Sequence, residues 1–149
     1  MAVPAHLVDT NILLRIARRD APDHSLVDAA LARLAEAGAR LYYTHQNMAE
    51  FWNVCTRPAD RNGFGLSVAD TDRQVRAIEK GMLLLPDSEA VYNEWRRLVV
   101  THSISGVKVH DARLVAAMHA HAVTRLLTLN PGDFARYSGI TVLHPRDVL

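Results

Sequence analysis

The chain has 149 residues, 49 % of them hydrophobic and 22 % charged, which is enough for the core of one globular domain. No apolar run approaches the ~20 residues of a membrane span and no secretory leader is evident, so we expect a cytoplasmic protein without membrane contact. The single cysteine, Cys55, excludes an intrachain disulfide and a thiolate metal site, and the net charge of +1 alone indicates no partner.

Short apolar runs alternate along the chain with longer segments of helical spacing. The runs cover residues 6–8, 41–43, 82–85, 125–129 and 141–143, and each predicts a strand. Between them, apolar side chains recur every three or four residues, in the groups Val27, Leu31 and Leu34; Met48, Phe51, Trp52 and Cys55; Val75, Ile78 and Met82; Val91, Trp95, Leu98 and Val99; and Val115, Met118 and Ala122. Strands that alternate with helices predict an α/β fold with a mostly parallel five-stranded sheet covered on both faces.

The clearest break in this pattern is the segment 57–67, which is rich in Pro, Gly and Asn. Neither side of it is long enough for a typical domain. We therefore interpret the segment as a connection inside a single domain that spans residues 1–149.

Four acidic residues fall where a parallel sheet gathers functional side chains, at the ends of strands or the starts of helices. Asp9 follows the first strand, Glu50 lies in the helix after the second, and Asp133 follows the fourth. Asp111 heads a helical stripe, four residues before Val115, so it shares the face that packs on the sheet. Because parallel strands end at one edge, we expect these side chains to converge there.

Each acid also has a purely structural interpretation. Asp9 is a good helix cap, and Glu50 at the border of an apolar stripe can pack its stem while its carboxylate reaches water. Asp111 in a first turn interacts with the helix dipole, which explains its position but not its face. Asp133 can reach back in a short helix that Asn130 caps.

Taken together, the four acids predict a metal site. Carboxylates that converge would repel one another and raise each other's pKa values, and a hard divalent cation with oxygen ligands, Mg²⁺ or Mn²⁺, resolves that conflict. Outside such a pocket seventeen basic groups face twelve acidic ones. A mildly basic surface suits a polyanion, although a mixed solvated surface has the same charge count.

Four segments in this order resemble PIN-domain ribonucleases, in particular the VapC-like toxins of bacterial type II toxin–antitoxin pairs. They read LVDTNILL, NMAEFWNV, VHDARLVAAM and LLTLNPGDFARY, and they span nearly the whole chain. The resemblance implies a PIN-like α/β/α sandwich. It also implies that the metal-site acids are Asp9, Glu50, Asp111 and Asp133, with Asp9 and Asp111 as the most direct ligands.

Neighbouring residues match the family pattern less uniformly. Thr10 and Asn11 match the turn beside the first acid, and Thr128 matches a small hydroxyl residue that lines the pocket in the family. Asn130 stands where many relatives have an acid, which leaves open whether a second metal binds. Among basic residues, Lys108 and Arg15 are candidates for contact with substrate phosphates, with a solvated helix face as the alternative for Arg15.

The resemblance further implies the reaction and the partners. The reaction is metal-dependent hydrolysis of RNA phosphodiesters, in which Glu50 or Asp133 orients or deprotonates the attacking water. The expected partners are an RNA substrate, a VapB-like antitoxin that covers the acidic pocket, and a second copy of the chain in a homodimer.

Two other functions fit parts of the sequence. A receiver-like signalling domain would use Asp9, Asp87 and Thr128, but His144 stands where such a domain needs a lysine. A PIN-fold binding module without nuclease activity is the second alternative, and intact acids at all four positions argue against it. His119 and His121 are two residues apart, so they point in different directions on a helix and do not chelate a metal together.

Overall fold

The computed structural model describes residues 4–149, and its centre is a five-stranded sheet in which every strand pair is parallel. The strands are β1 (Ala5–Val8), β2 (Arg40–Thr44), β3 (Leu83–Leu85), β4 (Arg125–Leu127) and β5 (Thr141–Leu143). Their order across the sheet is β3-β2-β1-β4-β5. The predicted α/β fold is confirmed, and each predicted strand overlaps an observed one.

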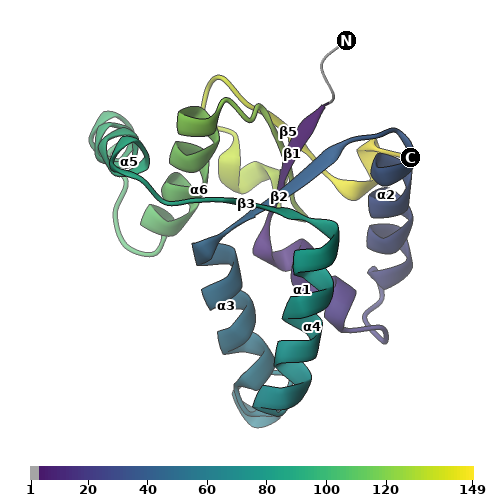
Figure 1. Ribbon diagram of the computed structural model, residues 1–149. Coiled ribbons are helices and arrows are strands. Elements are labelled where there is room, and N and C mark those ends of the chain that lie inside the picture. The colour runs from purple at the N-terminus through teal and green to yellow at the C-terminus, as the bar shows by residue number, and fades with distance from the viewer. Residues whose placement is uncertain (1–3) are drawn as a thin grey trace.

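Helices cover both faces of the sheet (Figure 1). One face carries α1 (Thr10–Ala17), α2 (His24–Glu36), α3 (His45–Thr56) and α4 (Val68–Gly81). The other face carries α5 (Glu89–Thr101) and α6 (Lys108–His121), which pack closely against each other. Three short 3₁₀ turns, η1 (Ala59–Arg61), η2 (Pro131–Phe134) and η3 (Pro145–Asp147), complete the described chain.

Alternation along the central strands divides the apolar core into two clusters. Leu7 and Leu126 are buried against α5 and α6, whereas Val8 and Leu127 are buried against the helices of the opposite face. Successive side chains of a strand point to opposite faces, so any two consecutive residues contribute one side chain to each cluster. Cys55 is a core residue of the second cluster, and burial raises the pKa of its thiol to about 11.

The segment 57–67 is an ordered connection from α3 to α4. It contains η1, and its backbone bonds to the end of α3, with Phe64 N–H donating to the Val54 carbonyl at 2.9 Å and Leu66 N–H to the Cys55 carbonyl at 2.8 Å. None of the helices within residues 4–149 is both long enough and apolar enough to cross a membrane.

Candidate active site

Asp9 lies at the carboxyl end of β1 and is the N-cap of α1. One carboxylate oxygen, Oδ1, accepts a hydrogen bond from Thr10 N–H at 2.7 Å, and the other, Oδ2, accepts one from the Thr128 hydroxyl at 2.8 Å. The capping interpretation of Asp9 is therefore confirmed, and the cap fixes the orientation of the carboxylate at the edge of the sheet where the site is predicted.

A polar network around Thr128 joins the ends of β1 and β4. The Asn11 side-chain amide donates to Thr128 Oγ1 at 3.2 Å and accepts a bond from Leu129 N–H at 3.2 Å. Asn130 N–H also donates to Thr128 Oγ1, at 3.1 Å. These bonds turn the chain sharply after Leu127, which is why β4 is two residues shorter than the predicted run 125–129.

The start of α3 supports the same corner through two side chains that sequence reasoning missed. Asn47 forms a capping box with Thr44, and its amide donates to the Thr10 hydroxyl at 2.9 Å. Gln46 donates from Nε2 to the His110 carbonyl at 2.9 Å, which ties α3 to the start of α6. The signal that was present is a capping box whose third helical residue is Asn in place of Glu or Gln.

Asp111 and Asp133 face a common cation, the Lys108 ammonium. Lys108 Nζ lies 3.2 Å from Asp133 Oδ1 and 3.9 Å from Asp111 Oδ2. Asn130 is the N-cap of η2 and Asp133 lies in its first turn, as the structural interpretation predicts, but Asn130 makes no side-chain cap bond and Asp133 bonds to Lys108 across the site.

The carboxylates influence one another's protonation. Burial, together with the charges of Asp111 and Glu50, raises the pKa of Asp9 to about 6, although the hydrogen bonds from Thr128 and Thr10 act in the opposite direction. Burial also raises the pKa of Asp111, and Asp133 and Glu50 add to that increase while Lys108 opposes it. The four predicted acids are therefore electrostatic neighbours, with Asp9 and Asp111 half-buried and Glu50 exposed to solvent.

Comparison with known proteins identifies the family to which this chain belongs. The family model of the PIN domain matches residues 6–140. The chain belongs to the PIN-domain family. Ribonuclease VapC24 from two strains of Mycobacterium tuberculosis is 31 % identical over 150 aligned residues, which cover 93 % of this chain and 94 % of the relative. The family match replaces the receiver-like alternative.

Solved structures show the same fold at lower sequence identity. VapBC2 from Rickettsia felis, bound to a DNA fragment from its promoter, is 13 % identical, covers 94 % of this chain and 98 % of that one, and has a TM-score of 0.70. FitAcB from Neisseria gonorrhoeae is 20 % identical, covers 95 % and 98 %, and has a TM-score of 0.65. The predicted PIN-like sandwich is confirmed.

The donor chemistry of this PIN domain fits a hard divalent cation. Within residues 4–149 no three acidic, imidazole or thiol groups lie close enough to ligate one ion directly. Mg²⁺ does not need such a cage, because it takes one or two carboxylates and keeps several waters that other carboxylates can hold. Asp9 and Asp111 supply half-buried oxygen donors whose repulsion a cation would relieve.

The remaining candidate residues of the PIN domain have partners elsewhere. Arg15 Nε contacts Asp23 Oδ1 at 2.7 Å, so its guanidinium is held at the start of α2. His119 lies between two acceptors, with Nδ1 2.6 Å from Glu94 Oε2 and Nε2 3.0 Å from the Ser138 carbonyl, and His121 Nε2 donates to the Pro86 carbonyl at 2.9 Å. The two histidines therefore point toward different partners, as their spacing predicts.

Proposed function

We propose that this PIN domain is a Mg²⁺- or Mn²⁺-dependent endoribonuclease that acts in the cytoplasm as the toxin of a toxin–antitoxin pair. The observation that supports it most is that Asp9 and Asp111, at one edge of a parallel sheet, both have raised pKa values, mainly because they are buried and in part because neighbouring carboxylates disfavour their charged forms. Carboxylates with pKa values perturbed in this way are a feature of functional sites. The name of the relative VapC24, a ribonuclease, supports the same chemistry.

In this proposal Asp9 and Asp111 hold the cation. When bound there, such a cation would supply positive charge at the scissile phosphate and would acidify an attacking water. Glu50, which is exposed to solvent, or Asp133 would orient and deprotonate that water. Lys108 contacts a phosphate oxygen of the substrate from its place between Asp111 and Asp133.

The polar network around Thr128 fixes the position of the Asp9 carboxylate. Thr128 and Thr10 each donate to Asp9, Asn11 and Asn130 fix Thr128, and the resulting corner keeps a carboxylate pointing at the substrate edge. Fixing a reacting group before substrate binds lowers the entropic cost of the reaction.

The proposed protein partners are a VapB-like antitoxin and a second copy of the chain. Solved structures that share the fold include a toxin–antitoxin complex from Klebsiella pneumoniae and a member of the VapBC family of toxin–antitoxin systems from Mycobacterium tuberculosis. The exposed Arg18 and Arg19 at the end of α1 would meet acidic groups of an antitoxin, with Arg15 beside them. Co-expression with the antitoxin should abolish RNA cleavage by the purified complex.

Cleavage of a labelled single-stranded RNA tests the activity. We expect cleavage with Mg²⁺ or Mn²⁺, none after EDTA, and a loss of at least roughly 100-fold in Asp9→Asn, because a metal contributes several kcal/mol of transition-state stabilisation. Asp60→Asn, an exposed acid in η1, is the matched control and should retain full activity. Circular dichroism verifies that both variants fold. Cleavage that persists in EDTA, or in folded Asp9→Asn, would refute the proposal.

A further inference from the structure

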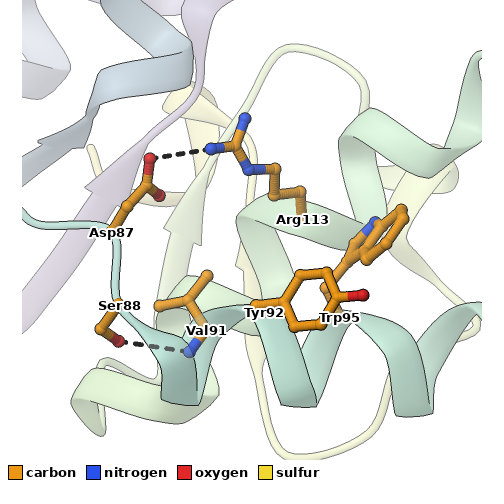
Figure 2. A pocket seen from close by; sticks show the side chains of 6 residues that line it. All are labelled: Asp87, Ser88, Val91, Tyr92, Trp95 and Arg113. Carbon is orange, nitrogen blue, oxygen red and sulfur yellow. Dashed lines mark hydrogen bonds and ion pairs between the residues drawn. The ribbon is translucent and has the colours of Figure 1, made fainter.

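A cavity of about 300 Å³ lies outside the acidic site, between the chain that follows β3 and the helices α5 and α6. Figure 2 shows the six residues that line it, which are Asp87, Ser88, Val91, Tyr92, Trp95 and Arg113. Most of its lining is apolar, and its volume is at the lower end of the ~300–1,000 Å³ typical of small-ligand sites. The size fits one flat ring system.

One wall of the cavity is aromatic. The rings of Tyr92 and Trp95 project from α5 with centroids 6.1 Å apart and planes tilted by 39°. Trp95 Nε1 donates to the Val109 carbonyl at 2.9 Å, so the indole is fixed before any ligand binds. Tyr92 is 57 % exposed, so its ring is accessible from solvent.

The opposite rim is polar and planar. An Arg113 guanidinium nitrogen donates to Asp87 Oδ2 at 2.8 Å, and His45 Nδ1 lies 3.5 Å from the same oxygen. A guanidinium stacks on aromatic ligands, and a carboxylate accepts hydrogen bonds from ring and exocyclic N–H groups. The Ser88 hydroxyl already accepts a bond from Val91 N–H, so it contributes little to recognition.

The cavity shares an edge of the sheet with the acids. Asp87 follows β3 by two residues and His45 directly follows β2, so both lie at the carboxyl ends of strands, as Asp9 does. The next residue after His45, Gln46, bonds to the His110 carbonyl beside Asp111. Residues that contact one another therefore connect the acids to the cavity along this edge of the sheet.

We propose that this cavity binds one unpaired base of an RNA substrate whose backbone crosses the acidic site. The inference rests on the proposed ribonuclease function and adds a recognition subsite to it. Single-stranded RNA is recognised mainly by bases stacked on aromatic side chains and guanidinium planes, with hydrogen bonds to base edges. Tyr92, Trp95, Arg113 and Asp87 supply those elements around a space of matching size.

Binding of RNA without cleavage tests the subsite. The probes are single-stranded hexaribonucleotides of mixed sequence, measured in EDTA with the Trp52→Phe variant, in which Trp95 is the remaining tryptophan. We expect RNA to quench Trp95 fluorescence. Loss of base–aromatic stacking in Tyr92→Ala should weaken binding by roughly 5- to 150-fold, whereas Tyr92→Phe keeps the ring and binds normally.

Two controls separate stacking from other effects. Val100→Ala truncates an exposed apolar side chain of the same helix, 71 % exposed and outside the cavity, and should bind as the parent does. A hexamer of abasic ribose units carries the same phosphates without bases, so its binding should be weak in the parent and unchanged by Tyr92→Ala.

The outcomes distinguish this inference from the nuclease proposal. Quenching that depends on Tyr92, in a protein that cleaves no RNA, supports the subsite and refutes the nuclease. Cleavage of RNA with equal binding by the parent and Tyr92→Ala refutes the subsite alone. Absence of any Trp95 quenching also overturns it. So does a sedimentation shift in which Tyr92→Ala disrupts a dimer and leaves RNA binding intact, since the face would then belong to a second copy of the chain.

Discussion

The two ends of α6 place ionisable side chains in opposite electrostatic situations. At the start of the helix, Asp111 lies among other carboxylates, and its pKa is raised by burial and by Asp133 and Glu50. At the end of the helix, His119 contacts Glu94 at 2.6 Å, and hydrogen bonds from Arg97 and His119 lower the pKa of Glu94 to about 2. The first end gathers several carboxylates around one lysine, Lys108, whereas the second end pairs charges of opposite sign.

This difference indicates that the start of α6 belongs to the candidate site, whereas its end stabilises the fold. Adjacent residues of α5 contact both ends of α6, Glu94 through His119 and Trp95 through the Val109 carbonyl. The paired end stabilises the fold and fixes the helix, so that the other end can hold carboxylates in an arrangement that costs stability. Substitutions at the two ends should therefore affect different quantities.

The largest effect is expected from Asp111→Asn. It should reduce metal-dependent RNA cleavage by at least roughly 100-fold, because a cation loses a buried anionic ligand. The free energy of unfolding of the metal-free protein should stay the same or rise by up to about 1 kcal/mol, because repulsion by Asp133 and Glu50 is removed. Activity assays and urea unfolding in EDTA measure the two quantities. A destabilised and fully active variant would reverse the assignment of this end as the functional one.

A smaller effect, confined to stability, is expected from Glu94→Gln at the other end. Glu94 accepts two bonds from Arg97, at 2.6 and 2.8 Å, in addition to the contact with His119. Loss of the charge should lower the free energy of unfolding by about 1–2 kcal/mol at pH 7. This value is smaller than that expected for hydrogen bonds between buried charged groups, because Arg97 is exposed to solvent. RNA cleavage should be unchanged.

The pH dependence of that effect has a fixed sign. The pKa of Glu94 is about 2 in the folded protein against an ordinary value of 4.5, so its stabilisation is complete above pH 4.5 and is lost as the pH falls toward 2. The difference between wild type and Glu94→Gln should shrink over that interval. Glu89→Gln, an exposed acid at the start of α5, should show no such trend. A difference that stays constant with pH would show that the effect is not electrostatic.

Sequence reasoning reached the fold and the four acids because both depend on local periodicity. The apolar run 6–8 ending at Asp9, and Asp111 in phase with Val115, report the strand edge and the helix face directly. The resemblance to PIN domains then assigned roles that periodicity does not contain. The comparisons confirm the family, and the roles of individual residues remain predictions.

The contacts that sequence reasoning missed are long-range ones. Gln46 and His110 are 64 residues apart and Glu94 and His119 are 25 apart, and no short motif encodes either pair. Trp95 fits the apolar stripe of its helix, so periodicity indicates a core residue and gives no sign of the cavity beside it. The capping position of Asp133 is visible in the local sequence, whereas its partner Lys108 lies 25 residues away and no local pattern indicates the pair.

The smallest effect is expected from Lys108→Met, which tests whether a weak ion pair is what balances the functional end. The ammonium is 43 % exposed and lies 3.2 Å from Asp133, so its contribution should be about 0.2–1 kcal/mol. Because the same charge repels a divalent cation, Mn²⁺ measured by calorimetry should bind Lys108→Met about 1.4- to 5-fold more tightly, and added salt should reduce the difference. Lys80→Met, at the end of α4, should bind Mn²⁺ as wild type does. Equal Mn²⁺ affinity in wild type and Lys108→Met would mean that the lysine does not offset the repulsion among the carboxylates at the start of α6. The two ends of α6 would then differ only because carboxylates repel one another at the start of the helix.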